Sequence, residues 1–216
     1  MTLELFAISG SPYTWRVQLA LESKRIPHTV RMLSISDGEL ESPSYLALNP
    51  RGRVPTLVDG DFVLTESLAM LAYLETKWPE PPLLGRSAQD TGNIWRVMAE
   101  YTSYVDESLR HFILPLYRGR GAELADQVRS AIVVLGPELA RYETQLARTQ
   151  WLVGDEVTAA DFCVFPHVQS ILRAASKDGA RAFEIPFLPL GPNLDRWRLA
   201  IEALPGYERT VPPHWR

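Results

Sequence analysis

One stretch sets the fold of the first part of the chain: Asn49-Pro-Arg-Gly-Arg-Val-Pro-Thr-Leu-Val-Asp-Gly-Asp-Phe-Val-Leu-Thr-Glu-Ser-Leu-Ala-Met-Leu-Ala-Tyr-Leu74. Its beginning, residues 49–52, has the composition of a turn. Two short apolar runs at 56–58 and 62–64 flank Asp-Gly-Asp at 59–61, which suits the tight connection of a hairpin. The stretch therefore predicts a turn followed by a two-stranded hairpin.

After the hairpin the apolar period changes to that of a helix. Thr65 is a suitable N-cap, Glu66 and Ser67 occupy the first turn, and neither Gly nor Pro occurs before Pro79. The predicted helix, residues 66–78, is apolar on more than one face, so another layer of the protein must cover it.

Two features of this stretch indicate a binding site. Pro55 cannot donate to a sheet ladder, so at a strand entrance it leaves Val54 on an edge, where its N–H and C=O can pair with a short extended peptide. A helix N-terminus favours anions, so Ser67 suits a carboxylate, and Glu66 suits an ammonium group. Each feature alone is better explained as a strand entrance or a helix cap. Their occurrence one hairpin apart favours a site for a peptide with a free amino-acid end.

The residues before this stretch predict a strand-helix-strand unit. Residues 3–8 alternate as a buried strand, Pro12 suits the first turn of a helix, and residues 28–33 read as a second, parallel strand. A short helical turn at 45–48 follows. The predicted order is β-α-β-α-β-β-α.

The rest of the chain is predicted to be helical. Pro-Glu-Pro-Pro at 79–82 has the composition of a stiff linker, and strand signals largely stop after it. We therefore place a first domain at 1–78, a linker at 79–89 and an all-helical domain at 90–216.

Within the helical domain, apolar residues recur at helical spacing over residues 94–112 and 124–146, which predicts two long antiparallel helices. Pro137 is expected to kink the second helix or divide it. A further helix at 159–175 is expected to be interrupted at Pro166. The last helix is predicted at residues 193–204.

A capping box is predicted where the helix at 159–175 begins. Thr158 and Asp161 have the required spacing, and Val157 is placed as the staple residue. We assign these residues a structural role.

Composition excludes several classes of function. The 216 residues carry a formal net charge of -4 with interspersed signs, which gives no indication of nucleic acid or an anionic membrane as a partner. The N-terminal residues lack the basic and long apolar regions of a secretory signal, and no apolar run is long enough to span a bilayer. We expect a cytoplasmic protein.

The single cysteine, Cys163, excludes an internal disulfide, and its apolar helical context predicts a buried, inert thiol. The four histidines are scattered and have no partners at the spacing of a zinc site. We predict no metal.

Four segments, in order, resemble the soluble glutathione transferases. Residues 9–21, Ser-Gly-Ser-Pro-Tyr-Thr-Trp-Arg-Val-Gln-Leu-Ala-Leu, look like the serine-type active segment of the zeta and tau classes of bacteria and plants. Residues 49–57 and the Glu66-Ser67 pair resemble the family's glutathione site, and residues 153–162 resemble its C-domain capping motif. The resemblance implies a thioredoxin-like βαβαββα domain, an all-helical domain, and a homodimeric enzyme of detoxification.

The resemblance also implies roles. Val54, before a cis Pro55, resembles the residue whose backbone pairs with the cysteinyl part of glutathione, and Glu66 and Ser67 resemble the pair that holds the γ-glutamyl end. Arg53 matches, loosely, a position that contacts the glycyl carboxylate. Ser11 resembles the catalytic hydroxyl.

The chemistry asked of Ser11 is modest. A thiol with a pKa near 8.5 is only about 3% thiolate at pH 7, and lowering that pKa by roughly two units makes it mostly anionic. One hydrogen bond from a hydroxyl, together with the positive field at the N-terminus of the following helix, stabilises a thiolate enough to lower the thiol pKa by this amount. Ser9 and Tyr13 are alternative donors, and Ser11 as a mere helix cap is the structural alternative.

For the second substrate, a small hydrophobic electrophile, three side chains are candidates. Tyr13, Tyr104 and His111 are predicted to line its pocket, and Tyr104 lies off the apolar stripe of its helix. The sequence does not name the electrophile.

Two departures from the family narrow the reaction. Zeta-type isomerases usually show Ser-Ser-Cys where this chain has Ser11-Pro12-Tyr13, which argues against maleylacetoacetate isomerisation. The absence of a cysteine in this turn excludes thiol chemistry through a mixed disulfide. Conjugation is the leading hypothesis; a glutathione-dependent isomerase or dehalogenase and a non-catalytic interaction module are the alternatives.

Overall fold

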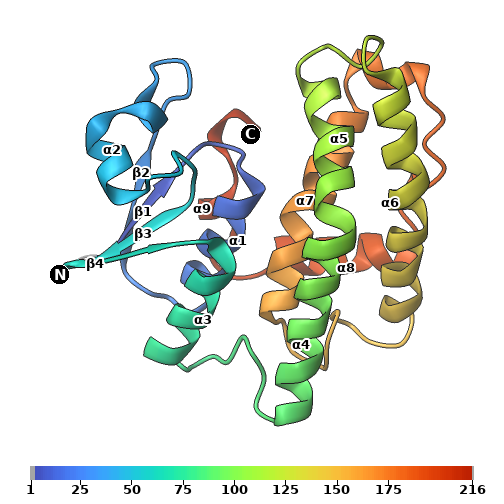
Figure 1. Ribbon diagram of the computed structural model, residues 1–216. Helices are drawn as coiled ribbons and strands as arrows, with labels where there is room; N and C mark the ends of the chain where they lie inside the picture. Colours follow the sequence, from blue (N-terminus) through green and yellow to red (C-terminus); the bar gives the residue numbers. More distant parts are fainter. Residues whose placement is uncertain (1–2, 216) are drawn as a thin grey trace. The chain divides into compact units, whose positions relative to one another are not determined.

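A computed structural model describes residues 3–215, and Figure 1 shows its helices and strands. The chain divides into two compact units. The first contains residues 3–84 together with 202–215, and the second contains residues 85–201. The expected helical domain extended to residue 216, whereas the segment after residue 201 is grouped with the first unit because it packs on a helix there.

The first unit is built on a four-stranded sheet in the order β2-β1-β3-β4. β1 and β2 are parallel, and the β1–β3 and β3–β4 pairs are antiparallel. The strands are β1 (Leu3–Ala7), β2 (His28–Met32), β3 (Thr56–Asp59) and β4 (Phe62–Thr65). The predicted strand-helix-strand unit and the predicted hairpin are therefore confirmed.

The helices of this unit connect and cover the strands. They are α1 (Pro12–Ser23), α2 (Pro43–Leu48), α3 (Ser67–Lys77) and the short C-terminal α9 (Tyr207–Thr210). A 3-10 turn precedes α2 at Glu39–Glu41, and another ends the described chain at Pro213–Trp215. α1 packs against both α3 and α9.

The second unit is helical, as predicted. Its helices are α4 (Ala88–Glu100), α5 (Asp106–Tyr117), α6 (Ala125–Leu146), α7 (Ala159–Ala175) and α8 (Pro192–Glu202). A π-helical segment, Tyr101–Val105, joins α4 to α5, and a 3-10 segment, Asp178–Ala182, follows α7. α4 and α5 both pack on α7, most of whose residues are buried, so α7 is the centre of this unit.

The expected interruption at Pro166 and the expected division of the second long helix at Pro137 are wrong, and the expected kink at Pro137 stays a prediction. α6 runs through Pro137 as one helix, and α7 runs through Pro166 without interruption. In α7 the buried setting explains the difference, because tertiary packing on α4 and α5 outweighs the loss of one backbone hydrogen bond. The first long helix, predicted over residues 94–112, is not a continuous α-helix, because the π-helical segment lies within it.

The capping box of α7 is confirmed and its carboxylate does more than cap. Asp161 is fully buried, and one of its oxygens accepts from the backbone N–H of Thr158 at 2.8 Å. Its other oxygen accepts from the backbone N–H of Leu152 at 2.9 Å and from the indole N–H of Trp197 at 2.8 Å. The cap thus joins α7 to the preceding loop and to α8. Cys163, two residues further on, is buried as predicted.

No helix within residues 3–215 is both long and apolar enough to cross a membrane.

Candidate functional site

The turn between β1 and α1 presents the predicted catalytic hydroxyl. Ser11 is the N-cap of α1, its backbone N–H donates to the carbonyl of Ile8 at 3.1 Å, and Pro12 follows as the first helical residue. The Ser11 hydroxyl oxygen accepts from the backbone N–H of Thr14 at 3.3 Å. Because the oxygen serves as the acceptor in this cap, the hydroxyl proton remains available to a second group.

The loop before β3 is held by buried polar side chains. The Tyr45 hydroxyl and the Asn49 side-chain amide each donate to the Arg53 carbonyl at 2.6 Å, and both also contact the Thr56 hydroxyl. Burial raises the pKa of Tyr45 against the opposing effect of its bonds to Thr56 and Asn49, which keeps the phenol protonated as a donor. This loop fixes the backbone immediately before Val54.

The Val54–Pro55 bond is cis. The expectation that Val54 lies on a sheet edge is wrong in one respect, because β3 is an interior strand between β1 and β4. The pairing of β3 begins only at Thr56, opposite Phe6 and Thr65, so the half-buried Val54 precedes the ladder. The backbone of Val54 therefore belongs to the loop that leads into β3 and lies outside the hydrogen-bonded ladder. The Arg53 side chain is exposed beside it.

The N-terminus of α3 is built on an unusual backbone. Glu66, not Thr65, is the N-cap, and Thr65 is the last residue of β4. Glu66 has φ +70° and ψ 110°, and its exposed side chain makes no capping hydrogen bond. A non-glycine residue in this region of φ costs of order 1 kcal/mol or more and typically marks a functional site. The Glu66 carboxylate is thus exposed and is not used to cap the helix it precedes.

A buried arginine links the two helix N-termini. Ser67 is buried at the first position of α3, and the guanidinium Nη1 of Arg16, on α1, lies 3.4 Å from its hydroxyl oxygen. Arg16 is only 2% exposed, and its guanidinium carbon also lies 5.3 Å from the centre of the Tyr13 ring. Its positive charge adds to the partial positive charge of the α3 N-terminus, so the position of Ser67 favours an anion.

The sequence interpretation did not single out Arg16. A signal was present, since Arg16 is a cation inside the run Thr14 to Val17, all of which is buried. A charge inside a buried helical run requires a partner or an anion.

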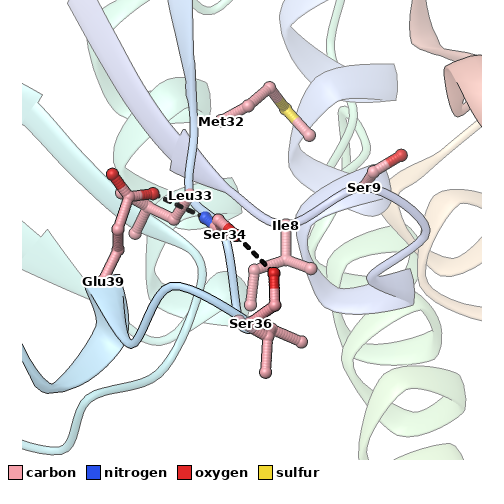
Figure 2. A pocket seen from close by; sticks show the side chains of 8 residues that line it. Ile8, Ser9, Met32, Leu33, Ser34, Ser36 and Glu39 are labelled. Carbon is pink, nitrogen blue, oxygen red and sulfur yellow. Dashed lines mark hydrogen bonds between the residues drawn. The ribbon is translucent and has the colours of Figure 1, made fainter.

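A cavity of about 650 Å³ adjoins the turn between β1 and α1, and Figure 2 shows its lining. Ile8, Met32 and Ile35 contribute apolar surface, and Met32 and Ile35 are exposed. The Glu39 carboxylate is held by the backbone N–H of Ser34 at 2.6 Å. The Ser9 hydroxyl in Figure 2 is turned away from these side chains. The cavity is suited to an apolar group.

The predicted electrophile residues fall in different units. Tyr13 is half-buried on α1 against Arg16. Tyr104 is 65% exposed in the π-helical segment, as expected from its place off the apolar stripe, and His111 is exposed on α5. Their role in binding an electrophile stays a prediction. Within residues 3–215 there is no group of three or more side chains placed to hold a metal ion.

These features define a class of protein: a four-stranded α/β unit with a cis-proline loop and two helix N-termini, followed by a helical unit. Family models agree with this class. Residues 10–77 match the glutathione S-transferase N-terminal domain, and residues 125–200 match the glutathione S-transferase C-terminal domain.

Individual relatives extend over nearly the whole chain. Glutathione S-transferase 3 of Zea mays is 31% identical, with 97% of this chain and 93% of the relative covered. A glutathione S-transferase from the Antarctic clam Laternula elliptica superposes with a TM-score of 0.84 at 30% identity, covering 100% of this chain and 94% of that one. A probable maleylacetoacetate isomerase 2 of Drosophila melanogaster is 26% identical over 96% of this chain and 87% of its own length. The chain belongs to the glutathione S-transferase family, and the fold and the family predicted from its motifs are confirmed.

Proposed function

We propose that this glutathione transferase binds glutathione on its first unit, stabilises the thiolate through the hydroxyl of Ser11, and conjugates the sulfur to a small hydrophobic electrophile. The observation that carries the proposal is the state of Ser11. Its oxygen is occupied by the cap of α1 while its proton is available, so the hydroxyl is oriented and can still donate.

The tripeptide would be held by backbone and charge. The exposed Glu66 carboxylate, unused by α3, suits the ammonium group of the γ-glutamyl end, and Ser67 above the buried Arg16 suits its carboxylate. The backbone of Val54, ahead of the β3 ladder, suits pairing with the cysteinyl residue, and Arg53 suits the glycyl carboxylate. Binding and activation are thereby assigned to different elements of the unit.

Activation of the sulfur needs no general base. A hydrogen bond from Ser11 to the thiolate contributes about 1.5 to 3 kcal/mol, which is the size of the roughly two-unit lowering of thiol pKa that ionises most of it at pH 7. The thiolate then attacks the electrophilic carbon, the carbon–sulfur bond forms, and the leaving group departs with the electron pair. Ser9, whose hydroxyl contacts His214, and Tyr13 are the alternative donors.

A second reaction of the same thiolate has one observation in its favour. The similarity to a probable maleylacetoacetate isomerase supports glutathione-dependent isomerisation, in which the sulfur adds to and then leaves the substrate. The Ser11-Pro12-Tyr13 sequence, which lacks the usual Ser-Ser-Cys, argues for conjugation.

We infer a cytoplasmic homodimer, in line with the family. Retention on immobilised glutathione and turnover of a panel of aryl halides, epoxides and a cis-enedione would separate the hypotheses. Conjugates of the halides or epoxides support transfer, cis–trans conversion alone supports the isomerase, and failure to bind glutathione would indicate a non-catalytic module. Sedimentation showing only the 24.4 kDa monomer would contradict the dimer.

A further inference from the structure

The C-terminal segment of residues 207–215, here called the strap, runs along α1 toward the catalytic turn. At the C-terminal end of α1, the guanidinium of Arg209 pairs with Glu22, with its Nε 2.9 Å from the carboxylate. In the first turn of α1, the indole N–H of Trp15 donates to the Thr210 hydroxyl at 2.8 Å. Figure 1 shows α9 beside α1. The strap is thus anchored before it reaches the turn.

At the N-terminal end of α1 the strap contacts the turn itself. The imidazole Nδ1 of His214 lies 2.7 Å from the Ser9 hydroxyl oxygen. Gly10 has φ +81°, and a Cβ there would lie 3.0 Å from the His214 ring carbon Cε1 and 3.2 Å from Nε2. Glycine therefore has two roles at position 10. It permits the positive φ, and its lack of a side chain leaves room for the imidazole of His214.

The hydrogen bonds assign the tautomer of His214. An indole N–H is only a donor, and that of Trp215 lies 2.9 Å from Nε2 of His214, so Nε2 is the acceptor. In the neutral imidazole the proton is then on Nδ1, which donates to Ser9. Trp215 is itself held edge-on against Trp15, with ring centres 5.1 Å apart. The imidazole is therefore oriented from both sides.

The contact between the strap and Ser9 can affect Ser11 because both serines belong to one short turn. Ser9 and Ser11 are separated only by Gly10. The Ser11 N–H donates to the Ile8 carbonyl at 3.1 Å, and the Ser11 carbonyl accepts from the Trp15 N–H at 2.9 Å. Glycine is the residue with the most backbone freedom, so an external contact is needed to restrict this turn. His214, through Ser9, supplies that contact.

We propose that His214 is a positioning residue for Ser11, acting through Ser9, so that the C-terminal strap fixes the hydroxyl that activates glutathione. This inference rests on the proposed role of Ser11. It assigns Ser9 to the support of the turn, which explains why its hydroxyl is turned away from the adjoining cavity.

The experiment compares His214→Ala with the wild type in steady-state kinetics and in the titration of bound glutathione. Losing one neutral hydrogen bond to the turn is expected to lower kcat about fivefold and to raise the apparent pKa of the bound thiol. KM for glutathione should stay within about twofold, because Glu66 and Ser67 hold the tripeptide elsewhere. His214→Asn, whose amide can donate in place of Nδ1, should restore most of kcat.

Two further variants test the route. Ser9→Ala should reproduce the effect of His214→Ala, and the double variant should lose no more than either alone. Pro213→Ala changes an exposed residue next to His214 and should leave kcat and thiol pKa within twofold of the wild type.

The outcomes are separable from those of the proposed function. Wild-type kcat and thiol pKa in His214→Ala would overturn the strap proposal, and so would an equal loss in Pro213→Ala or additive losses in the double variant. If Ser11→Ala also has full activity, the failure lies with the role of Ser11. If Ser11→Ala loses activity while the His214 and Ser9 variants keep wild-type kcat and thiol pKa, the proposed role of Ser11 is supported and the strap proposal is wrong.

Discussion

The N-termini of α1 and α3 use the same backbone feature in opposite ways. At α1, Ser11 is an extended residue whose side chain caps the helix, and this use of its oxygen orients the hydroxyl. At α3, Glu66 takes a positive φ, its side chain makes no capping hydrogen bond, and that side chain is exposed. The first arrangement is unstrained and holds one atom in place, whereas the second accepts strain to present a charge.

This difference indicates a division of roles. An oriented hydroxyl at a helix N-terminus suits the stabilisation of a developing thiolate, which depends on geometry. A carboxylate beside a hydroxyl that lies over a buried cation suits the two opposite charges of an amino-acid end. Arg16 lies between them, since it extends from α1 to Ser67 on α3. Variants at the N-terminus of α1 should therefore change kcat, and variants at the N-terminus of α3 should change KM for glutathione.

The largest effect is expected from Ser11→Ala. Loss of a hydrogen bond to the thiolate should lower kcat by roughly 10- to 150-fold with little change in KM for glutathione. Loss of the helix cap should also cost about 1 kcal/mol of stability. Steady-state kinetics and thermal unfolding measure the two.

The matched control is Ser87→Ala. Ser87 caps α4 in the same manner, accepting from the Asp90 N–H at 3.1 Å, but lies on the other unit. It should lose similar stability and keep full activity. If Ser11→Ala keeps its kcat, the catalytic donor is Ser9 or Tyr13.

Ser67→Ala should act mainly on binding. Removing the hydroxyl between Arg16 and the substrate carboxylate is expected to raise KM for glutathione roughly tenfold, while kcat at saturation changes little. Ser170→Ala is a suitable comparison, because Ser170 is another buried helical serine, bonded to the Pro166 carbonyl at 2.8 Å. A fall in kcat without a change in KM would break the division of roles.

Glu66 variants should give a smaller change, with a distinctive sign in stability. Since Glu66 is exposed, its ion pair with an ammonium group is worth up to about 1 kcal/mol, so Glu66→Gln should raise KM up to about fivefold. Glu66→Gly should bind equally weakly yet unfold at a higher temperature than Glu66→Ala, because glycine relieves the positive φ. Equal unfolding temperatures would refute the strain.

The smallest effect on catalysis is expected where the end of β3 contacts the C-terminal half of α3. Asp59, at the end of β3, accepts from Lys77 and from the Tyr73 hydroxyl of α3, and these bonds lower its pKa below the ordinary value of 3.8. A lowered carboxyl pKa contributes stability above pH 4 that is lost as the pH falls through the folded value.

Asp59→Asn should therefore unfold at a lower temperature than the wild type at pH 7, and the difference should shrink below about pH 4. KM for glutathione should not change. Asp61→Asn, an exposed change in the same hairpin, should match the wild type at both pH values. A difference that grows on acidification would contradict the assigned sign.

Local patterns predicted most of the fold because the strands and helices follow their own periodicity. The hairpin around Gly60, the start of α1 at Pro12 and the capping box at Thr158 are all local signals, and all are observed. The cap of α3 was placed one residue early, at Thr65, because a positive φ at a glutamate has no signature in the residue order.

The parts of the site that were missed depend on contacts distant in sequence. The pairing of Arg16 with Ser67 joins residues on separate helices, and that of Ser9 with His214 joins the two ends of the chain. Such contacts follow from how segments distant in sequence pack together within the first unit, which periodicity does not encode. The sequence placed the segment at 207–215 in the helical domain, and its packing on α1 assigns it to the other unit.

The most direct test of the division between binding and activation is the apparent pKa of the thiol of bound glutathione, measured by thiolate absorbance in the wild type, Ser11→Ala and Glu66→Gln at saturating glutathione. The account predicts a value roughly two units below 8.5 in the wild type and in Glu66→Gln, and a return toward 8.5 in Ser11→Ala. An unchanged value in Ser11→Ala, or a value raised in Glu66→Gln alone, would contradict it.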